Sequence, residues 1–411
     1  MSVLELRIDS IAAGGDGVGR HDGMVVFVPR TAPGDVVRVD AEHHDRLMRG
    51  RLLDVLQPST SRVEAPCSHY VVDRCGGCQL QHVEYDAQLE SKGRIVRDAI
   101  ARIGKIHCDA PTVEASAKPW RYRRKLTLAL RRHGNEWIAG LHRFDAPDEV
   151  FALQDCPITE ESVLRVWAKV MRHQDLFPPP GTPRLRGAVR ALAQGFSFTL
   201  EGARVWRTHA QFFAAIPELT ELWWAPQEQA RRLMHARRGH EAGASFVQVN
   251  PGVAERLRAW VFSLAAAFRP VTAVDAYSGT GDIALGLASQ GASVTAIEID
   301  EDAARVAAAR LPEGSRALAS PVEKALRRSL PADLVVLNPP RAGVDADVTE
   351  LLSSAQQKPN ALIYVSCNPA TLARDIRRLF NYEIRSLRGF DMFPQTAHVE
   401  TVCELVPVVA S

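Results

Sequence analysis

The feature that most constrains the fold of this chain is an alternation of short apolar runs with alanine-rich stretches between residues 241 and 411. Four runs are rich in β-branched residues and read as strands: 271–277 (VTAVDAY), 292–299 (ASVTAIEI), 332–338 (ADLVVLN) and 361–367 (ALIYVSC). Strand–helix–strand alternation predicts a doubly wound, mainly parallel sheet with ligands at the carboxyl ends of its strands. We therefore expect an α/β, Rossmann-like domain over residues 241–411.

Residues 1–58 have a different pattern. Short β-rich runs alternate with Gly-Gly-Asp-Gly and Ala-Pro-Gly-Asp turns, and Pro58 ends the segment. Such spacing predicts a small OB-like β-barrel, a fold that many RNA-binding proteins use.

Residues 59–240 read as a mixed α+β central domain that begins with a cysteine cluster. We expect a helix over 84–103, strands over 125–130 and 196–200, and helical stretches near 160–174 and 228–238. Three segments agree with the two or three domains that 411 residues suggest.

Composition narrows the class of protein. Hydrophobic residues make up 46% of the chain, as in ordinary globular proteins, and the net charge of +2 does not by itself indicate nucleic acid. No apolar run approaches the roughly 18 residues of a membrane span. The first ten residues lack the basic start and apolar run of a signal peptide. We expect a cytoplasmic protein with no membrane partner and infer no obligate protein partner.

A glycine-rich turn follows the first of the four strands. Asp275-Ala-Tyr-Ser-Gly279-Thr-Gly281-Asp282 leads from an apolar strand into a helix, and Glu298 ends the next strand. Glycines let a backbone turn tightly against a ligand, and a carboxylate at the next strand end can accept ribose hydroxyls. The pattern predicts a nucleoside cofactor, and NAD remains an alternative because the relaxed dinucleotide fingerprint is also met.

Two strand ends favour S-adenosylmethionine over NAD. Asp275 ends the first strand, where methyltransferases commonly place an acid. Asn338-Pro-Pro-Arg341 ends the strand at 332–338, where methyltransferases hold a target base. Enzymes that methylate exocyclic amines usually have an aromatic residue where Arg341 stands, which argues against that reaction.

Two residues are candidates for covalent chemistry. Cys367 lies at the carboxyl end of a strand, in Tyr-Val-Ser-Cys-Asn-Pro. A buried cysteine is usually inert, but one at a strand end facing a cofactor crevice is better placed to react. Glu400 lies in an alternating run that reads as a terminal strand and can bring its carboxylate to the same crevice.

The cysteine cluster indicates a metal site. Four cysteines, with two of them in Cys-Gly-Gly-Cys, supply the thiolates that tetrahedral zinc or a four-iron cluster needs: Cys67, Cys75, Cys78 and Cys156. Their spacing does not choose between the two metals. An odd total of seven cysteines argues against a disulfide framework.

A basic stretch is the best candidate for RNA contact. Residues 116–133 hold seven Lys or Arg and no acid, with Trp120 and Tyr122 interleaved. Positive charge binds phosphates and aromatic rings stack on splayed bases. The candidates are Arg121, Arg123, Arg124 and Lys125.

Five separated motifs together resemble one family. They are CGGC (75–78), FVQVN (246–250), DAYSGTG (275–281), VSCNPATLARD (365–375) and MFPQTAHVE (392–400). In this order they resemble the RNA uracil-5-methyltransferases, and most closely the branch with an N-terminal TRAM domain and a [4Fe-4S] cluster. The resemblance runs almost the length of the chain.

The resemblance implies a role for each motif. Cys367 would attack C6 of a uracil, Glu400 would remove the C5 proton, and Phe246 would stack on a base. The four cysteines would hold a [4Fe-4S] cluster, and the RNA would be 23S rRNA, with tRNA as the alternative. The positions that match contacts to S-adenosylmethionine are Gln248, Tyr277, Gly279, Gly281, Asp282, Glu298 and Asn338. The family commonly has Asp at the position of Asn338.

Three other functions are less compatible with the residues. RNA cytosine-5 methyltransferases use a cysteine in the motif at the end of the strand at 332–338, and Asn338-Pro-Pro-Arg341 has none. A redox enzyme with NAD and an iron–sulfur cluster would need an electron path that no motif specifies. A non-catalytic RNA-binding protein would not need both Cys367 and Glu400.

Overall fold

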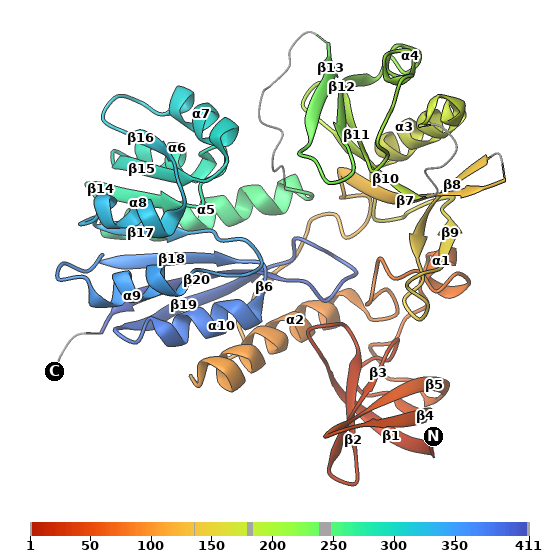
Figure 1. Cartoon of the computed structure of the whole chain (residues 1–411). Helices are drawn as coiled ribbons and strands as arrows, with labels where there is room; N and C mark the ends of the chain where they lie inside the picture. The colour runs from red at the N-terminus through yellow and green to blue at the C-terminus, as the bar shows by residue number, and fades with distance from the viewer. Residues whose placement is uncertain (1, 135, 179–183, 238–247, 409–411) are drawn as a thin grey trace.

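The computed structural model describes residues 2–134, 136–178, 184–237 and 248–408. They form a small barrel, a seven-stranded sheet and an eight-stranded sheet (Figure 1). Within these ranges no helix is both long enough and apolar enough to cross a membrane.

The first part is a closed five-stranded barrel, as the sequence predicts. Its strands are β1 (Ser2–Ile11), β2 (Gly17–His21), β3 (Met24–Val28), β4 (Val36–His44) and β5 (Leu47–Gln57). Alternate residues such as Ile8, Val26 and Val37 point inward and are fully buried, which is how period-two strands fill a small barrel. Beyond the barrel, Arg62 forms an ion pair with the buried Asp35 (2.6 Å) and so fixes the start of the next segment.

Within the described residues, two helices cover the apolar face of the seven-stranded sheet. Its order is β13-β12-β11-β10-β7-β8-β9. The strands are β7 (Lys125–His133), β8 (Glu136–His142), β9 (Val150–Ala152), β10 (Arg184–Ala191), β11 (Phe196–Glu201), β12 (Leu219–Ala225) and β13 (Arg232–Ala236). Helices α3 (Glu161–Arg172) and α4 (His209–Ala215) pack on its apolar face through Trp167 and Phe212.

The expected helix near 228–238 is wrong, because residues 232–236 form the edge strand β13, antiparallel to β12. The polar, arginine-rich sequence suits a helix as well as an edge strand. Arg231 and Arg232 lie over the rings of Trp223 and Trp224, at 4.7 and 4.6 Å from their centroids. Tertiary pairing therefore decides the conformation here.

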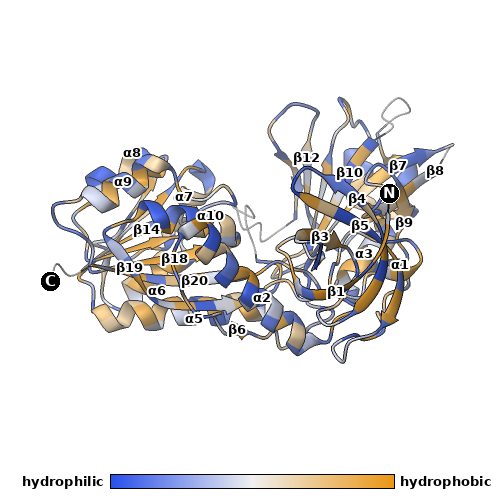
Figure 2. Ribbon diagram, turned by 90° about the horizontal axis from the view of Figure 1, so that it is seen from below, coloured by the Kyte–Doolittle hydropathy of each residue, from blue (hydrophilic) through white to orange (hydrophobic). Residues whose placement is uncertain are grey.

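The eight-stranded sheet has the order β16-β15-β14-β17-β18-β20-β19-β6. Its strands are β6 (Val113–Glu114), β14 (Thr272–Ala276), β15 (Ser293–Glu298), β16 (Arg316–Ala319), β17 (Leu334–Leu337), β18 (Ala361–Ser366), β19 (Tyr382–Phe390) and β20 (Glu400–Pro407). Strands β14 to β18 are parallel, whereas β20 runs antiparallel to β18 and β19. The central strands β17 and β18 are buried along their whole length, as in parallel sheets covered on both faces. Figure 2 shows the hydrophobic residues of this sheet in orange.

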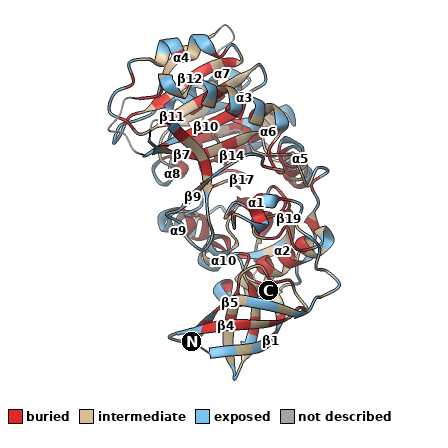
Figure 3. Ribbon diagram, turned by 90° about the vertical axis from the view of Figure 1, so that its right-hand side faces the viewer, coloured by how far each residue is buried: buried red, intermediate tan, exposed pale blue. Residues whose placement is uncertain are grey.

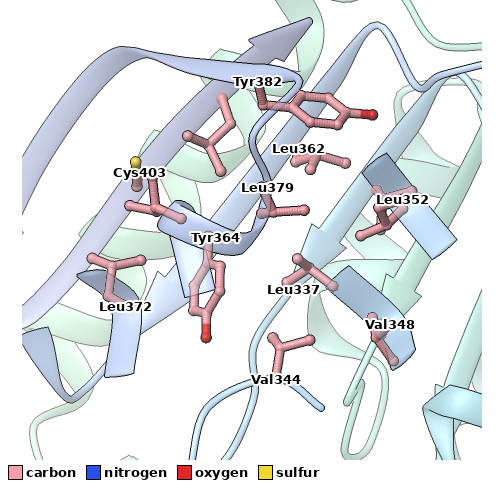
Figure 4. Close-up of a cluster of buried hydrophobic side chains, with 14 of the residues drawn as sticks. Leu337, Val344, Val348, Leu352, Leu362, Tyr364, Leu372, Leu379, Tyr382 and Cys403 are labelled. Atoms are coloured by element: carbon pink, nitrogen blue, oxygen red, sulfur yellow. The ribbon is translucent and has the colours of Figure 1, made fainter. Parts of the chain in front are cut away.

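Helices cover both faces of this sheet, so the predicted doubly wound fold is confirmed. One face packs against α2 (Tyr85–Ala99), α8 (Val322–Ser329), α9 (Ala346–Ser354) and α10 (Pro369–Arg378). Figure 4 shows part of this core, with Leu337, Tyr364 and Cys403 among its side chains. The other face packs against α5 (Pro251–Phe268) and α6 (Asp282–Ser289). Figure 3 shows buried strands between partly exposed helices.

Helix α2 and strand β6 come from the central segment of the sequence but pack with the eight-stranded sheet. Val96 on α2 is buried in the same core as the parallel strands, and Val113 on β6 pairs with Gly389 on β19. The sequence predicts this helix but not which sheet it packs against. A buried ion pair between Lys92 and Asp391 (2.5 Å) also fixes the helix to the end of β19.

Candidate active site and cysteine cavity

The candidate site lies at the carboxyl edge of the parallel strands. Strand order reverses beside β14, because β15 and β16 follow on one side and β17 and β18 on the other. At such a switch point the loops diverge and leave a crevice for a ligand. The glycine turn, Asn338 and Cys367 all follow strands at this edge.

The glycine turn has the backbone that its sequence predicts. Tyr277, Gly279 and Gly281 have positive φ angles of 63°, 55° and 82°. A side chain at Gly281 would come within 2.9 Å of Ala307, whereas space is open around Gly279. The amide of Gly279 donates to the Glu298 carboxylate (2.8 Å), which fixes that carboxylate beside the turn. The turn and the acid can therefore face a nucleoside together.

Polar atoms beneath the turn are buried. The carboxylate of Asp275 accepts a hydrogen bond from the amide of Ala284 (2.9 Å), and burial raises its pKa to about 7. Within the described part of the chain, the second oxygen of Asp275 and the hydroxyl of Ser278 are buried without a hydrogen-bond partner. Such atoms fit a site completed by a polar ligand. Asp282 instead forms an ion pair with Arg310 (2.8 Å).

Two further residues, Asn338 and Gln248, were expected to contact the cofactor. The amide of Asn338 donates to the carbonyl of Ala276 (3.2 Å), so Asn338 is held beside the first strand end. Gln248 is half-buried just before α5. Phe246 lies outside the described residues.

Strand register brings Cys367 and Glu400 together. β18 and β20 are antiparallel, and their last paired residues are Ser366 and Thr401. Cys367 follows Ser366 and Glu400 precedes Thr401, so the two side chains are one step beyond the same pair. No local sequence pattern gives this proximity, because the two residues are on strands that other elements separate.

Both side chains have raised pKa values, and Glu400 contributes to the shift at Cys367. Burial raises the pKa of Glu400 to about 7. Burial also raises the pKa of the Cys367 thiol, and the nearby Glu400 raises it further. Both shifts follow from the cost of placing a negative charge in a poorly solvated site.

Arg341 is the site residue to which sequence reasoning gave no role in catalysis. Its positive charge lowers the pKa of both Cys367 and Glu400. Asn368, the N-cap of α10, donates its side-chain amide to the carbonyl of Arg341 (3.3 Å). The only signal in the sequence was its place after Asn338-Pro-Pro. A cation here favours the thiolate, the form of cysteine that attacks.

The four cysteines of the sequence cluster line one cavity. It has a volume of about 60 Å³, and Cys67, Cys75, Cys78 and Cys156 are all buried, free thiols at its wall. Burial raises the pKa of Cys75 to about 11 and of Cys78 to about 12, and the neighbouring thiols add to both shifts. Among the described residues, no group of three or more His, Cys, Asp or Glu is arranged to hold a single metal ion.

A cation from the barrel lies against this cavity. Arg30 donates to the carbonyl of Cys75 (2.7 Å), and its guanidinium lies 3.2 Å from the ring centroid of Tyr70. Burial lowers its pKa to about 10, an effect that negative charge on Cys75, Cys78 and Cys67 would oppose. One of its terminal nitrogens is buried without a partner in the described residues. This charge fits a group of four thiolates.

Three of the four residues expected to contact RNA instead make contacts within the protein or line the cysteine cavity. Arg121 forms a two-pronged ion pair with Asp155 (2.8 Å) and donates to the carbonyl of Cys156 (3.0 Å), so it holds the loop of the fourth cysteine. Arg123 lines the cysteine cavity, and Arg124 donates to the carbonyl of Leu192 (2.9 Å). Of the four residues, only Lys125 lies on strand β7, where it is on the face opposite the one that α3 and α4 cover.

That face is basic. Residues on it alternate with those of the apolar face and pair across β7 and β10: Lys125 with Arg190, and Arg131 with Arg184. Burial and the neighbouring Arg190 lower the pKa of Lys125. Like charges placed this closely are a cost to the folded protein that phosphates of a bound polyanion would relieve.

Two family models match the chain. Residues 325–406 match the model described as tRNA (Uracil-5-)-methyltransferase, and residues 1–43 match the TRAM domain. The first match includes Asn338, Cys367 and Glu400. The second covers most of the closed barrel.

Relatives over the full length are RNA methyltransferases. The chain is 32% identical over 455 residues to an uncharacterized RNA methyltransferase of Thermosynechococcus vestitus, covering 98% of each. It is 33% identical over 447 residues to one of Gloeobacter violaceus, covering 98% of this chain and 96% of that protein.

Among solved structures, the fold is similar to that of the Pyrococcus abyssi tRNA (uracil-54, C5)-methyltransferase in complex with S-adenosyl-L-homocysteine. The TM-score is 0.71 at 22% identity, over 98% of this chain and 99% of that one. The similarity identifies a class I methyltransferase fold. The chain therefore belongs to the RNA (uracil-5-)-methyltransferase family and carries a TRAM domain at its N-terminal end.

Proposed function

We propose that this enzyme forms 5-methyluridine in RNA with Cys367 as the nucleophile and Glu400 as the base. The observation that supports this best is the meeting of a thiol, a carboxylate and Arg341 beyond the paired ends of β18 and β20. S-adenosylmethionine would supply an electrophilic methyl group. The residues proposed to bind it are Gln248, Tyr277, Gly279, Gly281, Asp282, Glu298 and Asn338.

The proposed reaction begins with the thiolate. C5 of uracil is a poor nucleophile, so Cys367 first adds to C6 and converts the ring into an enolate. C5 then takes the methyl group. Glu400 removes the C5 proton, and the electrons of that C–H bond re-form the C5–C6 double bond as the bond from Cys367 to C6 breaks. Arg341 stabilises the thiolate at the start and at the end.

The raised pKa of Glu400 predicts a dependence of turnover on pH. A base with a pKa of about 7 is protonated in acid, so the elimination rate should fall about tenfold per pH unit below 7. Single-turnover methylation between pH 5.5 and 9 would measure this, with a Glu400→Gln variant as the control. The methylated protein–RNA adduct should persist longer at pH 6 than at pH 8. An elimination rate with no inflection near 7 would contradict the assignment.

We propose that Cys67, Cys75, Cys78 and Cys156 hold a [4Fe-4S] cluster, with Arg30 offsetting its negative charge. Four buried free thiols around one cavity, and the resemblance described above, support this proposal. Methyl transfer moves no net electrons, so we propose a structural role for the cluster.

Protein prepared without oxygen should accordingly be brown and contain about four irons per chain. Cys78→Ser should lose the metal and, because ligand binding and local folding are coupled, become less soluble. Iron analysis and visible absorption would measure both, with Cys108→Ser as the matched control. Stoichiometric zinc with no iron in the wild-type preparation would refute the proposal.

We propose that the substrate is 23S rRNA and that the TRAM domain and the basic face of the seven-stranded sheet bind it. An enzyme with this substrate would work in the cytoplasm. The resemblance to the TRAM and iron–sulfur branch supports ribosomal RNA. The description of the matching family model favours the alternative, tRNA. Mapping 5-methyluridine in both RNAs from a strain that lacks the gene would decide. Loss from 23S rRNA alone is expected, and loss from tRNA alone would establish the alternative.

A further inference from the structure

The segment that leads into Glu400 is a loop, residues 391–399, which we name the base loop. It connects β19 to β20 and is closed by the pairing of Phe390 with Glu400. Glu400 is therefore the first residue after the loop. A shift of the loop would move the carboxylate relative to the uracil ring.

The cysteine-bearing segment, residues 67–80, forms hydrogen bonds with the centre of the base loop. The amides of Gln79 and Leu80, directly after Cys78, both donate to the carbonyl of Gln395 (3.0 Å each). Gln395 has a φ of 69°, a conformation that a non-glycine residue keeps only when its surroundings fix it. Two amides on one carbonyl supply such a constraint.

Gln88 on α2 makes a second connection between the same two segments. Its side chain is 1% exposed, and its amide nitrogen donates to the carbonyls of Leu80 (3.1 Å) and Val83 (2.8 Å). The nitrogen also donates to the side-chain oxygen of Gln395 (3.0 Å), and its own oxygen accepts from the amide of Gln395 (3.1 Å). One buried amide thus joins the chain after Cys78 to the base loop.

Tyr122 makes a third connection. It is buried among Cys67, Cys78 and Cys156, and its hydroxyl donates to the carbonyl of Pro394 (3.1 Å). Tyr122 thus contacts the cysteines with its ring and the base loop with its hydroxyl. A change in the packing of the cysteine cavity would reach Pro394 through this one side chain.

Cys367 is fixed by different contacts. The hydroxyl of Ser366 donates to the carbonyl of Asn368 (3.0 Å), and the side chain of Asn368 caps α10 by accepting from the amide of Ala370 (3.1 Å). These contacts lie within β18 and α10. Both residues depend on the pairing of β18 with β20, but these local contacts of Cys367 do not involve the base loop.

We propose that the cysteine-bearing segment positions the catalytic base, and that Gln88 and Tyr122 are the positioning residues that act through the base loop on Glu400. The inference rests on the proposed function of Glu400. It goes beyond that function because it gives the cysteine-bearing segment a role in one step, the removal of the C5 proton. Disturbing Gln88 or Tyr122 slows removal of the C5 proton and leaves attack by Cys367 and methyl transfer almost unchanged. A residue needed only for folding would slow all of these steps together.

Two RNA substrates separate the steps. RNA with 5-fluorouridine at the target position has no C5 proton to remove, so its covalent adduct forms at a rate set by Cys367 attack and methyl transfer. RNA with ordinary uridine and a labelled methyl donor reports the base step, because slow proton removal makes the labelled adduct accumulate. The variants are Gln88→Leu and Tyr122→Phe, and the control is Ser91→Ala, a buried site one turn further along α2.

In both variants, elimination from ordinary RNA should slow by about ten- to hundredfold, since small misplacements of a catalytic group cost this much. The rate with fluorinated RNA should stay within about twofold of wild type, and Ser91→Ala should change neither. Hydrogen exchange at the amide of Gln395 should be faster in Gln88→Leu. Tyr122→Phe decides the question if Gln88→Leu does not fold.

Parallel loss of both rates, or no change in either, would overturn the inference. If the wild-type enzyme forms no adduct with fluorinated RNA, the proposed function of Cys367 fails first, and this inference fails with it.

Discussion

A Glu400→Gln variant should lose turnover and accumulate a methylated protein–RNA adduct that survives denaturation. Glutamine has the size of glutamate but cannot accept the C5 proton, so the thioether bond to C6 cannot break. Attack and methyl transfer precede this step and do not need the carboxylate. Removing the charge also lowers the pKa of the neighbouring thiol, since Glu400 raises it. Adduct formation should therefore be at least as fast as in the wild type.

The measurement is a denaturing gel with labelled methyl donor and substrate RNA. Glu404→Gln is the matched control, because Glu404 is a buried carboxylate on the same strand, with Ser386 and Arg385 as its partners. The Glu404→Gln control should methylate RNA and release it, without accumulating a covalent protein–RNA adduct. A Glu400→Gln protein that folds and binds both substrates but forms no labelled adduct would remove Glu400 from the role of base.

A Cys367→Ala variant should lose both methyl transfer and the covalent adduct. Without the thiolate no enolate forms, and C5 remains a poor nucleophile, so we expect a loss of at least about 10⁴-fold, typical for removal of a catalytic nucleophile. Stability should change little, because Cys367 is only half-buried at a strand end.

The comparison with Glu400→Gln gives this prediction its control. Both variants should be inactive in turnover, but only Glu400→Gln should trap RNA, a difference that loss of folding cannot produce. Cys403→Ala tests for a general effect of removing a buried thiol, since Cys403 lies deep in the core away from the strand end. An RNA adduct formed by Cys367→Ala would exclude Cys367 as the nucleophile.

The sequence predicted the elements that have strong local signals. The strand, glycine turn and helix at 272–289 need positive φ angles at Gly279 and Gly281, and these are present. The barrel was predicted because its turns and alternating strands are local features. The edge strand β13 was not, because its pairing with β12 and the stacking of Arg231 and Arg232 on tryptophans are long-range contacts.

The candidate site was predicted as a set of residues and not as an arrangement. Resemblance to a family chose Cys367 and Glu400, but their proximity follows from the pairing of β18 with β20. The place of Arg341 near both side chains is another long-range feature of the fold, so its effect on their pKa values was missed. Arg121 was expected to contact RNA because it lies in a basic run without acids. In the structure it instead bonds to Asp155 and to the carbonyl of Cys156.

The burial of polar side chains was also beyond the sequence. Gln88 and Lys92 are on the helix that sequence periodicity predicts, yet both are buried and bonded to the base loop or its first residue. Removing one partner of a buried ion pair such as Lys92 and Asp391 typically costs about 3–5 kcal/mol. Such contacts connect residues about 300 positions apart, and only the folded chain reveals them.

The identity of the methylated nucleoside distinguishes the proposed reaction from other methylations of RNA. The purified enzyme is incubated with a labelled methyl donor and substrate RNA, and the RNA is digested to nucleosides and separated. The proposed reaction predicts that the label is in 5-methyluridine, and that Cys367→Ala yields none. Label in 5-methylcytidine or in an N-methylated purine, or undiminished labelling by Cys367→Ala, would contradict the proposed reaction.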